Sequence, residues 1–290
     1  MMDLLRAEWK KLIGNRMLAG FTIWLYPVGL FAFILVMGLL FLLGGNVEME
    51  MSPSWTGPML AAWDIITRFP TASISRLPLL AFMAVMVAGE YEWGTWKSLV
   101  PRRSRRAILL TKIVTMALLV VMAIGLTSLI SGPVRYGTAH LLGIETEGGL
   151  PADERAAFLE AYALETGLAF IQSLFLACFA TLSALLTRTI VGSLLLSFGL
   201  SMLEMLAPIL MTLLSRLLEK PDIVNAYAYF PGYLIDNLRS WLLHDSPLYT
   251  GLPAFTNDLN AGTSALLLAG LLAGFIALCL WLFQRQDITS

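Results

Sequence analysis

Charged residues are scarce in this chain. Asp, Glu, Lys and Arg make up 13% of its 290 residues, while 58% of the residues are hydrophobic. A soluble domain carries about twice that share of charge. A chain of this length and composition has no room for a large soluble domain, so we expect a single transmembrane domain over residues 1–290.

The motifs of nucleotide binding and of catalysis are also missing. No lysine in the chain follows a glycine, which excludes the phosphate-binding loop G-x-x-x-x-G-K-[ST]. The two cysteines lie in apolar stretches and the two histidines are isolated, so neither a disulfide framework nor a His/Cys metal site is expected. We therefore expect no catalytic residue, no metal site and no cofactor in this chain.

Long hydrophobic runs are abundant. A helix needs about 20 mainly apolar residues to cross a bilayer. Six segments meet this requirement, namely about 17–43, 69–89, 107–132, 163–186, 190–215 and 263–283. Only residues 187–189 separate the fourth segment from the fifth, which indicates a tight helical hairpin. The predicted fold class is an all-α integral membrane protein with six transmembrane helices.

The distribution of Lys and Arg predicts the orientation of the spans. Twelve of the 19 basic residues fall on the side that carries both termini, and seven are spread over the longer loops of the other side. Cytoplasmic loops carry the excess of Lys and Arg in membrane proteins. Both termini are therefore expected on the cytoplasmic side of a multi-pass protein in the bacterial inner membrane.

Residues 1–16 have the pattern of an amphipathic helix. Leu5, Trp9 and Leu12 share one face, and Arg6, Lys10 and Lys11 lie around the other side. Such a helix is suited to the inner membrane interface, with Trp9 at the acyl boundary and Lys10 and Lys11 at anionic headgroups. The alternative is a simple positively charged anchor.

The loop over residues 90–106 is the most unusual segment, because it combines acids, tryptophans and a basic cluster. Thr95 is a suitable N-cap for a short helix that begins at Trp96 and that Pro101 ends. We expect this transverse helix to present Trp93, Trp96 and Leu99 at the membrane surface. The basic residues beyond it are expected at the lipid headgroups; they are Arg102, Arg103, Arg105 and Arg106.

Two interpretations of this loop are possible. Exposed tryptophans flanked by charges are suited to docking in the groove of a partner protein. Anchoring to lipid headgroups is the alternative, and it explains the arginines well. It explains Glu90 and Glu92 poorly, because acids next to anionic lipids are unfavourable.

These segments resemble the permease subunits of bacterial type 2 ATP-binding-cassette exporters. The resemblance lies in Leu-Leu-Arg-Ala-Glu-Trp-Lys-Lys-Leu before the first span, in Glu-Tyr-Glu-Trp-Gly-Thr-Trp-Lys-Ser-Leu-Val-Pro with the basic cluster after it, and in the six-span layout. It implies that residues 1–16 form a connecting helix and that the 90–106 loop holds a coupling helix. The implied docking residues are Glu90, Glu92, Trp93, Gly94, Thr95, Trp96, Lys97 and Leu99.

The same resemblance implies the partners. ATP and magnesium would be bound by a separate nucleotide-binding ATPase subunit, and a second permease chain, identical or a paralogue, would complete the unit. The function implied is export of an amphipathic drug, peptide or lipid, with no nucleic acid involved. The alternative is a membrane scaffold or sensor that recruits a soluble partner through the 90–106 loop without transport.

Glu204 is the one ionisable residue expected well inside a span, four residues before Pro208. An acid at this depth is costly and is by default a functional hypothesis. Three roles are open for it. Glu204 could lie on a substrate pathway, where it contacts a cationic substrate or relays a proton. It could form a hydrogen bond that holds two spans together, or it could be solvated near the outer interface. The long segment 216–262 is expected to form either short helices at the outer leaflet or a packed outer cap.

Overall fold

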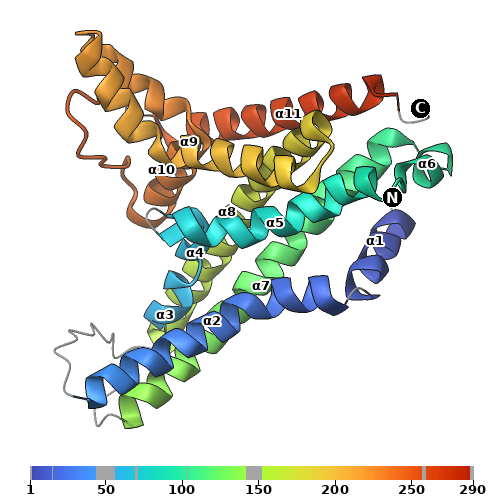
Figure 1. The fold of residues 1–290 in the computed structure, drawn as a ribbon. Coiled ribbons are helices and arrows are strands. Elements are labelled where there is room, and N and C mark those ends of the chain that lie inside the picture. The colour runs from blue at the N-terminus through green and yellow to red at the C-terminus, as the bar shows by residue number, and fades with distance from the viewer. Residues whose placement is uncertain are drawn as a thin grey trace.

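The structure is a computed structural model that describes residues 2–14, 16–43, 56–68, 71–102, 104–141, 152–256 and 259–287. These residues are helical or irregular and contain no strand, which confirms the predicted all-α class (Figure 1). The helices are α1 Met2–Gly14, α2 Arg16–Leu42, α3 Thr56–Ala61, α4 Asp64–Thr67, α5 Thr71–Glu92, α6 Trp96–Leu99, η1 Val100–Arg102, α7 Arg105–Leu141, α8 Ala152–Thr187, α9 Ile190–Leu217, η2 Pro221–Tyr229, α10 Pro231–His244 and α11 Ala261–Arg285.

Six of these helices are long and apolar enough to cross a membrane, namely α2, α5, α7, α8, α9 and α11. Two of them extend well beyond the apolar segments of the sequence. The third predicted span, 107–132, lies in a helix of 37 residues, and the fourth, 163–186, lies in a helix of 36 residues. Hydropathy detects only the apolar part of a helix, whereas backbone hydrogen bonds continue through polar residues outside the hydrocarbon layer.

The hairpin between α8 and α9 has the short connection expected from the sequence. Arg188 adopts the left-handed backbone conformation with φ of 57°. Thr189 then begins α9, because its hydroxyl accepts a hydrogen bond from the amide of Gly192 at 3.2 Å. Only Arg188 and Thr189 separate the two long helices.

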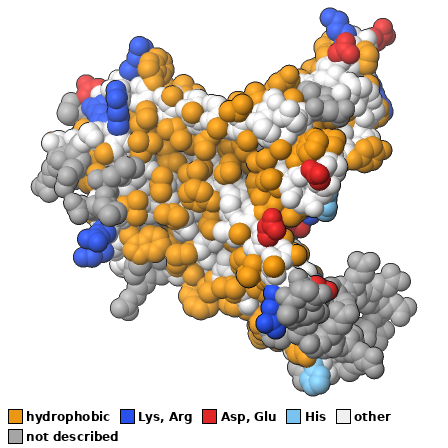
Figure 2. Space-filling model, turned by 180° about the vertical axis from the view of Figure 1, so that it is seen from behind, with side chains coloured by type: hydrophobic (Ala, Val, Ile, Leu, Met, Phe, Trp, Pro, Cys, Tyr) orange, Lys and Arg blue, Asp and Glu red, His pale blue; other side chains and the backbone are white. Residues whose placement is uncertain are grey.

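The centre of the bundle is α8, which packs against α5, α7, α9 and α11. In α8, 78% of the spanning segment is buried within the protein, against 12% in α2 and 17% in α11. The outer helices therefore turn apolar side chains outward. Figure 2 shows the result as a broad hydrophobic surface across the middle of the molecule.

The two ends of the bundle differ. Both termini lie at one end, together with α1 and α6, and we call this the terminal end (Figure 1). At the other end, the far end, α2 and α7 diverge from α9, so that the bundle opens into two arms (Figure 1).

Within the 216–262 segment, α10 folds back and packs on α8 and α11. It buries Tyr233, Leu234 and Ile235. The Asn237 amide nitrogen donates to the Leu259 carbonyl at 2.8 Å. The segment was expected to form either short helices at the outer leaflet or a packed outer cap, and α10 has the packing of a cap.

Candidate functional site

The loop between α5 and α7 lies at the terminal end and begins with a sharp turn. Gly94 has φ of +66°, a left-handed conformation that glycine adopts without the steric cost paid by other residues. The turn places α6 across the end of the bundle. The short helix expected from the sequence is therefore present, and its bounds are Trp96–Leu99.

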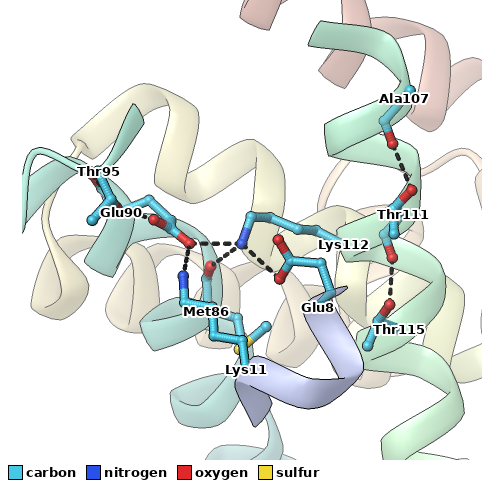
Figure 3. Close-up of polar contacts among 9 residues, drawn as sticks. All are labelled: Glu8, Lys11, Met86, Glu90, Thr95, Ala107, Thr111, Lys112 and Thr115. Carbon is cyan, nitrogen blue, oxygen red and sulfur yellow. Dashed lines mark hydrogen bonds and ion pairs between the residues drawn. The ribbon is translucent and has the colours of Figure 1, made fainter. Parts of the chain in front are cut away.

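A buried ionic cluster lies directly behind this turn (Figure 3). Lys112 of α7 is fully buried, and its ammonium lies 2.8 Å from Glu90 Oε1 and 3.2 Å from Glu8 Oε2. It also donates to the Met86 carbonyl at 3.3 Å. Lys11 pairs with the same Glu90 carboxylate.

The cluster connects four parts of the chain. Glu8 and Lys11 come from α1, Glu90 from the last turn of α5, and Lys112 from α7, while the Thr95 hydroxyl donates to Glu90 from the start of the loop helix. Charges in an apolar interior are tolerated only when they are paired and hydrogen-bonded. A displacement of α6 must therefore either carry Glu90 and the helices paired with it along or break the hydrogen bond between Thr95 and Glu90.

Trp96 does not face outward, so the prediction that the loop presents it at the surface is wrong. Its side chain is 1% exposed. The ring lies 4.8 Å from the ring of Phe283 in α11 and 5.6 Å from that of Tyr91, and the Lys112 ammonium lies 5.7 Å from its centroid. Burial of a large aromatic outweighs its use as a surface anchor, and Trp96 attaches α6 to α7 and α11.

The exposed part of the loop is smaller than the expected docking set. Trp93 is 58% exposed, and Gly94 and Lys97 are exposed beside it, whereas Glu90 is buried in the ionic cluster. The carboxylate of Glu92 accepts a hydrogen bond from the Ile190 amide at 2.7 Å, at the first turn of α9. Glu92 is exposed as well, although its carboxylate is held at α9 by this hydrogen bond. The residues of the loop that a partner can reach are therefore Glu92, Trp93, Gly94 and Lys97, with Thr95 and Leu99 half-buried.

The basic residues assigned to lipid headgroups divide into two groups. Arg106 is exposed, while Arg105 donates to the carbonyl groups of Phe283, Gln284 and Gln286 at 2.7–3.1 Å. Arg105 thereby satisfies the free carbonyls at the end of α11. Arg103 and the side chain of Arg102 lie outside the described residues. In α1, Trp9 is half-buried, while Lys10 and Lys11 are exposed.

Glu204 lies on a buried polar stripe of α9, together with Ser193, Ser197 and Ser201. Its carboxylate Oε2 lies 3.0 Å from Nη1 of Arg76, which also donates to Ser201 at 3.1 Å. Nε of Arg76 donates to a backbone carbonyl, that of Ile66, at 2.9 Å. This ion pair joins α9 to α5, which is the geometry expected if Glu204 holds two spans together. A place on the substrate pathway stays a prediction.

Sequence reasoning missed a second charged cluster, which lies toward the far end and joins α4, α8 and α10. Nε of Arg239 lies 2.8 Å from Glu165 Oε1, and the same guanidinium pairs with Asp236. Nε of Arg68 lies 3.1 Å from Oδ1 of Asp64. Burial raises the pKa of both Asp64 and Asp236, and the neighbouring arginines oppose that rise. The only sequence signal for this cluster was the acid of Glu165 close to the start of a predicted span.

The described residues contain no group of three or more His, Cys, Asp or Glu side chains that could hold a metal ion. The sequence profile described as "ABC-2 family transporter protein" matches residues 2–288 and so includes all six spans. No curated protein and no solved structure was found to match the chain.

Proposed function

The chain belongs to the ABC-2 transporter family as a membrane permease without ATPase activity of its own, and we propose that it exports an amphipathic substrate. The match over residues 2–288 is the observation that carries this proposal. Permeases of this family work with an ATPase subunit, so the ATP is bound and hydrolysed by the partner. A second permease chain, identical or a paralogue, completes the transport unit.

The terminal end is the side on which the ATPase docks. It carries exposed Lys10, Lys97, Arg188 and Arg285, and a positively charged end is expected on the cytoplasmic side. The contact surface that we propose is Trp93, Gly94 and Lys97 with the adjacent turn at Arg188. A small recess of about 220 Å³ lies between the loop and Arg188.

Movement of the ATPase reaches the spans through two sets of contacts behind this surface. The ionic cluster around Lys112 joins α6 to α1, α5 and α7. Trp96 joins α6 to α11 through Phe283. Packed elements with discrete arrangements transmit such displacements as rigid-body shifts, which is the physical basis of alternating access.

The experiment is a detergent pull-down of the tagged chain co-expressed with its ATPase, in wild type and in Trp93→Ala/Lys97→Glu. Both side chains are exposed, so the variant is expected to fold. Tyr249→Ala/Lys220→Glu is the matched control, because it makes the same kinds of change in exposed residues outside the terminal end. We expect the ATPase to co-purify with wild type and with the control, and to be lost from the loop variant.

Two results contradict the proposal in different ways. If no nucleotide-binding protein purifies with wild type, the transport function fails and recruitment of another partner becomes the explanation of the loop. If the ATPase remains bound to the loop variant, the family assignment stands but the docking surface is wrong. ATPase stimulation by added lipophilic compounds in the wild-type complex then tests transport itself.

A further inference from the structure

The recess between the loop and the turn that joins α8 to α9 has a volume of about 220 Å³. The rings of Tyr91 and Trp96 form part of its lining, and Lys97, Arg188 and Asp287 bring charges to it. Sites for small molecules have volumes of roughly 300–1,000 Å³. This recess therefore has room for one protein side chain rather than for a transported molecule.

Both aromatic rings are held in place by contacts with other parts of the chain. The Tyr91 hydroxyl donates to Gln286 Oε1 at 2.5 Å, and Gln286 Nε2 donates to the Leu185 carbonyl at 2.5 Å. The Trp96 ring packs against that of Phe283 in α11. The recess is therefore already formed before a partner binds, and a side chain that enters it pays little for ordering the protein around it.

The recess carries more positive than negative charge. Lys97 and Arg188 are exposed, and neither side chain makes an ion pair or a hydrogen bond with the residues that the structure describes. Glu90 also lines the recess, but it is buried and its charge is compensated by the lysines of the ionic cluster. Among the described residues of the lining, Asp287 is the one exposed acid. Two exposed cations thus face one exposed anion.

The backbone at Arg188 is unusual for an arginine. Its φ of 57° lies in the left-handed region, which glycine occupies without the steric cost that other residues pay. The guanidinium has no partner among the described residues, and the neighbouring acid, Glu92, has its carboxylate at the Ile190 amide. An arginine where the turn favours glycine, with its charge left unpaired, indicates a guanidinium that binds something outside this chain.

We propose that the recess receives a single acidic side chain, an Asp or Glu of the ATPase, whose carboxylate lies between the Lys97 ammonium and the Arg188 guanidinium. This inference rests on the proposed function and adds to it the chemistry of the partner's contact. A guanidinium binds a carboxylate through two parallel N–H···O bonds, which fixes the direction of approach as well as the charge. Such a pair is weak while it is open to water and becomes stronger when the docked partner excludes water from it.

The contact would give the ATPase a second attachment to the spans. Lys97 belongs to α6, whereas Arg188 follows α8, the central helix of the bundle, directly. One carboxylate bound by both would therefore hold the loop helix and the α8–α9 turn to the same point of the partner. A movement of that point would displace α8 without passing through the ionic cluster around Lys112.

Carbodiimide cross-linking of the purified complex tests the contact directly. The reagent takes up the water that is lost when a carboxylate and a lysine amine form an amide, so it joins only groups that are already in contact. Lys97 is reactive in wild type, and Arg188→Lys places a second amine in the recess while it keeps the charge. Both amines should be joined to the same Asp or Glu of the ATPase, identified by peptide mass spectrometry. Arg106→Lys is the matched control, because Arg106 is exposed near the loop but does not line the recess.

A binding measurement with Arg188→Gly removes the guanidinium without straining the turn, since glycine adopts this backbone conformation readily. The variant should keep the Tm of wild type and bind the ATPase about tenfold more weakly, the factor for one hydrogen bond to a charged group. Glu219→Gly is the matched control. Glu219 is also an exposed charged residue with a positive φ, of 54°, but it lies beyond the opposite end of α9, and its loss should leave the affinity unchanged.

The proposal is overturned if the ATPase co-purifies but neither amine is joined to one of its carboxylates, or if Arg188→Gly binds it as tightly as wild type does. Equal cross-linking of the same acid by Arg106→Lys also overturns it, because the recess would then select nothing. A loss of affinity that appears in nanodiscs of phosphatidylglycerol but not in those of phosphatidylcholine would assign the two cations to lipid phosphates instead. In each of these cases the ATPase is still bound by wild type, so the transport function stands; its absence from the wild-type pull-down would remove both.

Discussion

Lys112 offers the sharpest test of how the loop is attached to the spans. Lys112→Met keeps an unbranched, apolar side chain of similar length but removes the charge that lies between Glu90 and Glu8. Glu90 keeps Lys11 and Thr95 as partners. Glu8 loses its ion pair with Lys112, and its side chain is only 9% exposed.

Removing one partner of a buried ion pair costs about 3–5 kcal/mol, because a charge is left buried without compensation. At roughly 2–4 °C per kcal/mol, the melting temperature Tm of the purified chain should fall by about 6–20 °C. Lys112→Met combined with Glu8→Gln and Glu90→Gln removes the orphaned charges as well. A neutral cluster of similar volume can be as stable as the ionic one, so the triple variant should recover most of the loss.

The assay is thermal unfolding in detergent, followed by size-exclusion chromatography of the protein that stays soluble. Lys97→Met is the matched control, because this lysine is exposed on the same loop and its loss should change Tm very little. The reasoning is refuted if Lys112→Met has the same Tm as wild type, or if the triple variant has a lower Tm than Lys112→Met. The triple variant in complex with the ATPase further shows whether the charges are needed for coupling or only for folding.

Three further predictions concern the other clusters. Arg76→Ala leaves the Glu204 carboxylate buried without its guanidinium and should cost about 3–5 kcal/mol, measured as a fall in Tm. Burial raises the pKa of Asp64 and Asp236, so the folded protein holds their protons more tightly than the unfolded chain does. The contribution of these two groups to stability therefore falls as the pH rises above their usual pKa of 3.8. The Tm of wild type relative to that of Asp64→Asn/Asp236→Asn should increase as the pH is lowered from 7 toward 4. Trp96→Ala should cost about 3–5 kcal/mol because the ring is buried, whereas Trp93→Ala should stay within about 0.5 kcal/mol in the same unfolding assay.

Each of these predictions has a control or an outcome that contradicts it. For Arg76, the more conservative Glu204→Gln keeps an oxygen that can accept from the guanidinium and should cost less; a larger loss would mean that the pair is not what holds α5 to α9. A constant Tm difference across the pH range would show that neither aspartate has a raised pKa. Equal losses for the two tryptophan variants would contradict the inward orientation of Trp96.

The sequence alone determined the features that depend on neighbouring residues. Six apolar segments of sufficient length, an amphipathic start and a short helix in the charged loop are local patterns, and each corresponds to a helix in the structure. Pro101 does not end the short helix, because a 3-10 turn continues through it to Arg102. The basic loops indicate an orientation for the same reason. Membrane solvation makes this possible, because every spanning segment must satisfy its own backbone hydrogen bonds.

Tertiary structure decided which side chains meet. Arg76 and Glu204 are 128 positions apart, and Lys112 reaches Glu8 across 104 positions. No periodicity in either segment specifies such a pairing, because it depends on how α1, α5, α7 and α9 are arranged around α8. For the same reason, Trp96 reads as an exposed anchor in the sequence yet is buried against Phe283, which comes from the other end of the chain.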